Sequence, residues 1–193
     1  MKTKNNKAMI NHFNRKNVSL FLLLCSMVIT GAMAQSEALV VIDKDYAQKE
    51  KLQTKLPSNI TIVYLDGSSN PWKMIRETLE KNRNLKSIHL FVESSYNTLM
   101  MGGIEYTDAA VDAEFELPML EGLYLGSHYQ LLLYTCNLSS NPEGLQLIKK
   151  IGDKAYFNMA AISKCTDIFN TPLEFDYSSL NQPVVAPILT NQN

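Results

Sequence analysis

The feature that most constrains the fold of this chain is an alternation of short apolar runs with longer amphipathic segments. Continuous apolar strands that alternate with helices are typical of a parallel sheet covered on both faces. The expected strands cover residues 38–43, 60–66, 87–92, 130–136 and 156–162. We therefore expect one α/β domain, a three-layer sandwich around a mainly parallel sheet with strand order 2-1-3-4-5.

The segments between these strands carry helix signals. Asn70 or Ser69 suits the N-cap of a helix whose first turn holds Pro71. The two glycines at positions 102 and 103 indicate a small β excursion over residues 99–106. The expected helices cover residues 46–56, 71–82, 107–125 and 142–154, the third of them irregular and broken near Pro118.

The first 34 residues have the composition of a secretory signal. Residues 1–17 are polar and basic, residues 18–34 are almost wholly apolar or small, and Ala32-Met33-Ala34 supplies the small residues that a signal peptidase reads. An uncleaved anchor is the alternative, although this apolar segment is at the short limit for a bilayer span. We expect cleavage before Gln35. That leaves one domain over residues 35–193, with no membrane span, in an oxidising periplasmic or extracellular compartment.

The charge is distributed unevenly along the chain. The sequence has 19 acidic and 18 basic residues, but five of the bases precede residue 35, so that 13 bases face 19 acids in the remainder. Between Lys86 and Lys149 there is no Lys or Arg at all. A nucleic-acid-binding protein needs clustered cations to displace counterions from phosphates, so this composition argues against one.

The carboxyl ends of the strands are where function is expected, because ligands bind at that edge of open parallel sheets. Asp43, Asp66, Glu93 and Cys136 end four of the predicted strands, and Cys165 follows the fifth. With the expected order, Asp43, Glu93 and Cys136 share one edge. The simpler alternative for Asp43 and Asp66 is that each caps the helix that follows it.

Several motifs give residues 38–178 a resemblance to a known family. They are Val40-Val41-Ile42-Asp43, Leu132-Leu133-Tyr134-Thr135-Cys136-Asn137, Ala160-Ala161-Ile162-Ser163 and Thr166-Asp167. In this order and spacing the chain resembles the caspase-like domain of unknown function found in large secreted bacterial adhesin-type proteins. The resemblance implies a caspase-like sandwich at the bacterial cell surface. It also implies a dyad of a His after the third strand and a Cys after the fourth, which makes Cys136 the nucleophile.

The chain departs from that family where the dyad requires other residues. Glu93 stands at the position of the His, Ser94 replaces the Gly whose amide would help to hold an oxyanion, and Thr135 replaces the Gly before Cys136. A carboxylate beside a thiol disfavours the thiolate, which is the nucleophilic form. The dyad is therefore expected to be lost.

No other histidine is well placed to replace the missing one. His89 lies four residues before Glu93, about 13 Å along a strand, and His128 precedes the fourth strand. Both are expected to be ordinary residues that flank strands. Lys164, close to the end of the fifth strand, is the one cation expected near Cys136.

Two further hypotheses concern the same edge. Cys136 ends the fourth strand and Cys165 lies just beyond the fifth. Neighbouring strands lie about 4.8 Å apart, so a disulfide between the two cysteines is possible in an oxidising compartment. Asp43 and Asn137 are expected at the edge of a pocket. No cofactor or metal is expected: five acidic residues could bind Ca²⁺, but they lack the spacing of a known loop, and a solvated acidic face is the better interpretation. These are Glu105, Asp108, Asp112, Glu114 and Glu116.

Together these observations favour an exported pseudoenzyme. We expect a catalytically degenerate caspase-like domain that binds an unknown protein or peptide, or serves in surface assembly. The alternative is a cysteine-dependent peptidase or hydrolase that uses Cys136 with another helper residue.

Overall fold

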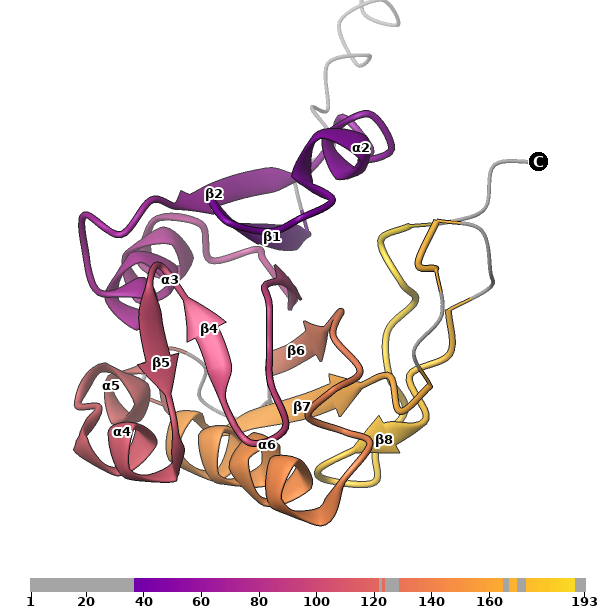
Figure 1. The fold of residues 1–193 in the computed structure, drawn as a ribbon. Coiled ribbons are helices and arrows are strands. Elements are labelled where there is room, and N and C mark those ends of the chain that lie inside the picture. The colour runs from indigo at the N-terminus through magenta and orange to yellow at the C-terminus, as the bar shows by residue number, and fades with distance from the viewer. Residues whose placement is uncertain (1–36, 122, 124–128, 165–166, 170–172, 190–193) are drawn as a thin grey trace, which may run out of the picture. The chain divides into compact units, whose positions relative to one another are not determined.

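A six-stranded sheet forms the centre of the domain (Figure 1). The structure, a computed structural model, describes residues 37–193 except 122, 124–128, 165–166, 170–172 and 190–193. The predicted signal at residues 1–34 therefore lies outside the described residues. In sheet order the strands are β2 (Thr61–Leu65), β1 (Ala38–Asp43), β3 (Ser87–Phe91), β6 (Tyr129–Leu133), β7 (Phe157–Ala161) and β8 (Tyr177–Ser178).

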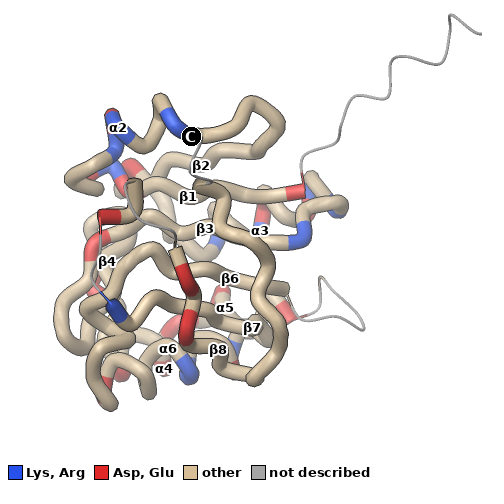
Figure 2. Tube along the Cα trace, turned by 90° about the vertical axis from the view of Figure 1, so that its right-hand side faces the viewer, with Lys and Arg blue, Asp and Glu red and all other residues tan. Residues whose placement is uncertain are grey.

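Five of these strands are parallel and one is not. Each neighbouring pair from β2 to β7 is parallel, whereas β8 pairs with β7 in the antiparallel direction. Figure 2 shows the strands one above another, from β2 near the top to β8 near the bottom. The prediction of an α/β fold with a mainly parallel sheet is confirmed.

The sheet order differs from the predicted five-strand order because β8 is added beyond β7. This strand is only two residues long, too short to produce the alternating pattern that reveals a strand. A separate two-stranded sheet lies between β3 and β6 in the chain. It consists of β4 (Leu99–Met101) and β5 (Ile104–Tyr106), which pair antiparallel.

Helices cover one face of the large sheet. They are α3 (Pro71–Lys81), α4 (Asp108–Ala113), α5 (Glu116–Glu121) and α6 (Pro142–Ala155). Their apolar side chains pack with alternate residues of the strands into one core, which includes Trp72 and Ile75 of α3 and Ile148 of α6. The sequence periodicity predicts α3 and α6 because both have a single apolar stripe.

Side-chain caps determine where these helices start. Asn70, not Ser69, is the N-cap of α3: its Oδ1 accepts a hydrogen bond from the Lys73 N–H at 3.0 Å. Asn141 caps α6 in the same way through the Gly144 N–H at 2.8 Å. In both helices a proline follows the cap, where its missing N–H has no cost.

The opposite face of the sheet is covered differently. Among the described residues, one short helix, α2 (Lys49–Gln53), contributes to this second core, and most of the cover is an extended C-terminal segment that includes Leu173, Phe175 and Ile188. Figure 1 shows this segment, in yellow, across the sheet from α3. The predicted helix over residues 46–56 is thus shorter, and the third layer is largely non-helical chain.

The region between β5 and β6 contains two helices instead of one. The break falls at Glu114–Phe115, between α4 and α5, and Pro118 lies inside the first turn of α5. The predicted break at Pro118 is wrong, because a proline in a first helical turn removes no intrahelical hydrogen bond. Within the described part of the chain, none of the helices combines the length and the apolar character needed to cross a bilayer.

Candidate functional site

A pocket of about 260 Å³ opens at the carboxyl edge of the large sheet. Segments that follow β1, β3, β6 and β7 supply its walls, as expected for a ligand site in an open parallel sheet. We call it the Cys136 pocket. Its lining residues are Tyr46, Ala47, Gln48, Val92, Glu93, Tyr134, Thr135, Cys136, Asn137, Ile162, Lys164 and Ile168.

Cys136 is half-buried in this pocket and is disulfide-bonded. The predicted partner, Cys165, lies outside the described residues, so the pairing with Cys165 stays a prediction. A sulfur held in a disulfide is neither a thiol nor a thiolate, and it cannot attack a carbonyl carbon. In this state Cys136 is therefore part of the wall of the pocket.

Two loops are joined beside Cys136 by the side chains of Ser94, Thr135 and Asn137. The hydroxyl groups of Ser94 and Thr135 form a short hydrogen bond with one another. The Asn137 side-chain amide donates to the Ser94 carbonyl at 2.9 Å. Ser94 thus connects the chain after β3 to the chain after β6, and its carbonyl is already engaged.

The loop that carries Cys136 is held in turn by the start of α6. The Asn141 side-chain amide donates to the carbonyls of Tyr96 and Asn137, each at 2.8 Å. Gly144 lies so close to this loop that a Cβ atom there would be 2.0 Å from the Leu138 carbonyl oxygen. The backbone after Cys136 is therefore fixed by packing that only glycine permits at position 144.

Glu93 is exposed at the rim of the Cys136 pocket. Its Oε1 accepts a hydrogen bond from the Ala47 N–H at 3.1 Å, which connects the chain after β3 to the chain after β1. Burial, together with the charges of Glu93 and Asp167, raises the pKa of Tyr46 to about 12. Tyr46 therefore stays protonated at neutral pH and presents a neutral phenol to the pocket.

Lys164 is exposed and lines the same pocket, as the sequence predicted for a cation near Cys136. Its charge also acts on Asp176. Although burial alone would raise the pKa of Asp176, hydrogen bonds from Ser163 and the charge of Lys164 hold it below its ordinary value. The pocket thus carries one carboxylate and one ammonium group on different segments of its wall.

The two aspartates predicted at strand ends have structural roles. Asp43 is buried and does not line the Cys136 pocket: its Oδ1 accepts from the Asp45 N–H at 2.9 Å, and its Oδ2 accepts from the Gly102 N–H. The carboxylate thereby anchors the β4–β5 hairpin to β1. Asp66 is exposed, and hydrogen bonds from the Ser68 hydroxyl and N–H lower its pKa. The alternative that each aspartate caps the following helix is wrong, because the N-caps of α2 and α3 are Gln48 and Asn70. Each carboxylate instead stabilises the turn that follows its strand.

His89 lies within β3 and is 2% exposed, with its ring in the interior. Its Nδ1 is 2.8 Å from the Tyr134 hydroxyl and its Nε2 is 3.1 Å from the Ser87 hydroxyl. Burial lowers the pKa of His89 to about 4, so the ring is neutral at pH 7. In the sheet His89 pairs with Leu132, four residues before Cys136, about 13 Å along a strand. His128 lies outside the described residues.

The acidic residues between Lys86 and Lys149 divide into two groups. Glu114 and Glu116 are buried, which contradicts the prediction of a solvated face for these two. The Glu114 carboxylate accepts hydrogen bonds from the Asn70 amide at 2.8 Å, the Tyr106 hydroxyl at 3.1 Å and the Glu116 N–H at 2.9 Å. These hydrogen bonds offset the free-energy cost of removing the carboxylates from water.

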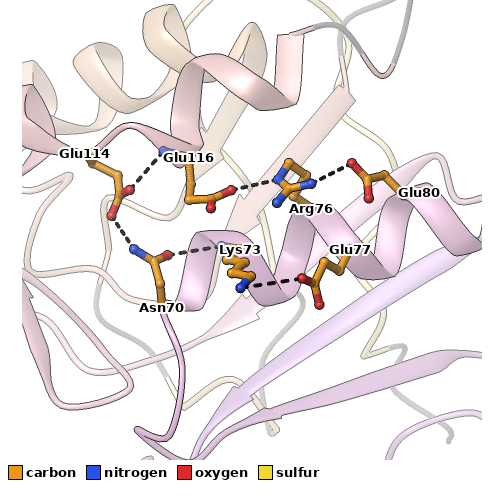
Figure 3. A network of polar contacts seen from close by, with 7 residues as sticks. All are labelled: Asn70, Lys73, Arg76, Glu77, Glu80, Glu114 and Glu116. Carbon is orange, nitrogen blue, oxygen red and sulfur yellow. Dashed lines mark hydrogen bonds and ion pairs between the residues drawn. The ribbon is translucent and has the colours of Figure 1, made fainter.

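Arg76 completes this network between α3 and α5. Its Nε donates to Glu116 and its Nη1 to Glu80, each at 2.7 Å (Figure 3). These two hydrogen bonds raise the pKa of Arg76 above its ordinary value. The ion pair between Arg76 and Glu116 thus connects α3 to α5.

The remaining acids of this stretch lie on the surface. Asp108 and Asp112 share Lys150, each with an oxygen 2.7 Å from its Nζ, and Glu105 is exposed on β5. Among the described residues, no three His, Cys, Asp or Glu side chains are grouped so that they could hold a metal ion.

Comparison with known proteins identifies the family. A family model described as a domain of unknown function, DUF4347, matches residues 39–168. The chain belongs to this DUF4347 family. No curated protein and no solved structure matches it. The matched segment begins in β1 and ends beside Asp167, so it spans every segment that lines the Cys136 pocket.

Sequence reasoning found part of this DUF4347 site. It brought together Glu93, Cys136, Asn137 and Lys164, which line one pocket in the structure, and Ser94, which is hydrogen-bonded to two residues of that pocket. It missed the contribution of the β1–α2 connection, in which residues 46–48 form one wall. The sequence could have predicted this wall, because the connection follows the carboxyl end of a predicted strand, as do the other segments that line the pocket.

The Cys136 pocket combines neutral polar, charged and apolar groups around an oxidised cysteine. Thr135, Asn137 and Gln48 supply neutral polar groups, Glu93 and Lys164 supply opposite charges, and Ile162 and Ile168 supply an apolar floor. Such a mixture can hold a small polar segment by hydrogen bonds and ion pairs. Covalent catalysis would need a free thiolate with a base in reach, whereas the sulfur here is oxidised and His89 is neutral and engaged elsewhere.

Proposed function

We propose that this DUF4347 chain is an exported, catalytically inactive binding domain related to caspase-like proteins. The observation that carries the proposal is the state of Cys136. Its sulfur is in a disulfide, and Glu93, not a histidine, occupies the neighbouring rim of the same pocket. A cysteine peptidase needs the opposite arrangement, a free thiol with a base or cation that favours the thiolate.

Two further observations support a caspase-like ancestry and export. The parallel strands deliver the segments after β3 and β6 to one pocket, which is where the resemblance places a His and a Cys. A disulfide is stable in an oxidising compartment, which agrees with the secretory signal predicted for residues 1–34. The binding or surface-assembly role follows from a pocket that retains polar and charged groups without a nucleophile.

The proposed ligand is a protein or peptide segment that carries both a cationic and an anionic group. Glu93 would pair with the cation and Lys164 with the anion, while the exposed amide of Gln48 would bind a main-chain group of the segment. The pocket volume of about 260 Å³ is at the small end for ligand sites. It suits one or two residues of a peptide.

Peptide binding tests the first half of the proposal. The purified protein is presented with a library of short peptides, and bound sequences are recovered and measured individually. Glu93→Gln should lower the affinity for the selected peptides, because it removes the negative charge at the rim of the pocket. The matched control is Glu105→Gln, an exposed glutamate on β5 outside the pocket, which should leave affinity unchanged. Equal affinity of both variants for every selected peptide would show that the Cys136 pocket is not the binding site.

A cleavage assay tests the second half. The same library is incubated with the protein in the presence and absence of a reductant, and products are read by mass spectrometry. We expect no cleavage in either condition. Cleavage that depends on reductant and disappears in Cys136→Ala would establish the alternative, a thiol hydrolase helped by a group such as Lys164.

A further inference from the structure

The two edges of the large sheet are built differently. One edge is β8, a two-residue antiparallel strand, and a strand this short offers little backbone to an incoming chain. The other edge is β2, which has five residues and pairs only with β1 among the described strands. Only the β2 edge is long enough to accept another strand.

The backbone N–H and C=O groups of Ile62 and Tyr64 point away from β1, toward the open edge of the sheet. The Lys44 N–H donates to the Leu65 carbonyl at 2.9 Å, and β1 and β2 are parallel and in register from Leu39–Thr61 to Asp43–Leu65. In a parallel pair, alternate residues make both of their hydrogen bonds to the neighbour. Thr61, Val63 and Leu65 therefore bond to β1. No backbone hydrogen bond from another described segment reaches Ile62 or Tyr64.

The β2 edge also lacks the features that normally prevent strand addition. Those features are charged side chains, proline and bulges, and residues 61–65 contain no charged residue and no proline. In Figure 2 the trace of β2 is tan, while blue and red segments mark α2 nearby. Ile62 is 38% exposed and Tyr64 is 43% exposed, although both are large and largely apolar.

We propose that β2 is a self-association edge, which pairs antiparallel with β2 of a second copy of this chain about a twofold axis at Val63. In this register Ile62 of each copy lies opposite Tyr64 of the other copy, and the backbone groups of both residues point across the new interface. Each such pair exchanges two backbone hydrogen bonds. The two six-stranded sheets then become one continuous sheet. This inference is independent of the proposed binding function.

The sequence of β2 is self-complementary in this register, which favours a second copy over an unrelated strand. Ile62 and Tyr64 form two symmetry-related pairs of a β-branched and an aromatic side chain, a favourable cross-strand combination. Asp66 lies opposite Ile60, so that no like charges oppose each other. The Tyr64 ring is already positioned, because its hydroxyl accepts a hydrogen bond from the Gln53 amide at 3.0 Å.

Sedimentation velocity over a wide range of protein concentration tests the inference. We expect a monomer–dimer equilibrium for the purified protein. Ile62→Lys should raise the dissociation constant about tenfold or more, because it alters both symmetry-related pairs. The matched control is Phe115→Lys, which adds the same charge at an apolar residue that is 68% exposed and distant in sequence from the edge. It should leave the equilibrium unchanged. A protein that stays monomeric, or a dimer equally weakened by both variants, would overturn the inference.

A cross-linking pair tests the register without relying on Ile62→Lys folding well. Val63→Cys places the introduced thiols of two copies opposite each other, with Cβ atoms about 4.5–5.5 Å apart, near the range of a disulfide. Thr61→Cys is the control on the same face: it opposes Leu65, and its two thiols are separated by about 13 Å along the strand. Under mild oxidation only Val63→Cys should give a covalent dimer cross-linked at the substituted position. Equal cross-linking of both variants, or of neither, would overturn the register.

Discussion

Glu114 and Glu93 both belong to the long acidic stretch without Lys or Arg, yet they have opposite environments. Glu114 is 8% exposed and accepts hydrogen bonds from Asn70, Tyr106 and the Glu116 backbone. Glu93 is exposed at the Cys136 pocket and accepts one hydrogen bond, from the Ala47 N–H. The first carboxylate is buried with three donors supplied by the fold, whereas the second is exposed with one and retains capacity for a ligand.

This difference distinguishes a glutamate that stabilises the fold from a glutamate that is available to a ligand. A buried charge persists only when other groups of the fold compensate it, so its partners are built in. A charge at the shared carboxyl edge of parallel strands needs no such partner. Solvent compensates it until a ligand replaces the solvent.

The largest expected effect is the loss of the Glu114 carboxylate. Glu114→Ala leaves the Asn70 amide and the Tyr106 hydroxyl without their acceptor in a buried site, which should lower the free energy of unfolding by about 3 kcal/mol. Glu105→Ala, at an exposed glutamate of the same stretch, should change it by less than about 0.5 kcal/mol. Urea denaturation of the two variants measures the difference. Similar values for both would mean that the Glu114 network contributes little.

His89 belongs with Glu114 as a buried, fully engaged group, and pH tests this. Its folded-state pKa of about 4 lies below the unfolded value of about 6.5. The unfolded chain therefore binds a proton first as the pH falls. Stability is complete above about pH 6.5 and declines by about 1.4 kcal/mol per pH unit as the pH falls toward 4, which is about 2 kcal/mol at pH 5.

The control for this pH dependence is His89→Gln, which cannot titrate. Denaturation at pH 7, 6 and 5 should show a shallower decline in the variant, and the difference between the two slopes isolates the imidazole from the carboxylates. Parallel slopes would place His89 in contact with solvent in the native state.

The smallest expected effect on stability is that of Glu93→Gln. The amide oxygen can still accept from the Ala47 N–H, and the site is exposed, so the free energy of unfolding should change by less than about 0.5 kcal/mol. Thermal unfolding measured beside Glu114→Ala checks this. A loss as large as that of Glu114→Ala would assign Glu93 to the architecture and weaken the comparison.

Much of the fold could be predicted because it follows from local patterns. Apolar runs and helical stripes located five strands and the helices α3 and α6, and the Asn70–Pro71 pair indicated where α3 starts. The failures have physical causes. The strand β8 has two residues, and the cover formed by the segment around Leu173 to Ile188 has no regular period that a sequence could display.

The site was predictable only as far as topology determines it. The ends of β3 and β6 were expected at one edge, which brought Glu93 and Cys136 together correctly. The burial of Glu114 was not predictable, since its partner Asn70 is 44 positions away in the sequence. Asp43 was placed at the right edge, but its carboxylate is directed to the Gly102 amide, a contact set by the β4–β5 hairpin.

The central claim is that Cys136 is not a catalytic thiol, and thiol labelling tests it most directly. The native protein is treated with iodoacetamide at neutral pH, with and without prior reduction, and modification at Cys136 is measured by peptide mass mapping. Without reductant we predict no modification, because the sulfur is in a disulfide. After reduction we predict a reaction no faster than that of a small thiol of ordinary pKa. Rapid modification of the unreduced protein, or a reduced thiol far more reactive than a small thiol, would contradict the account.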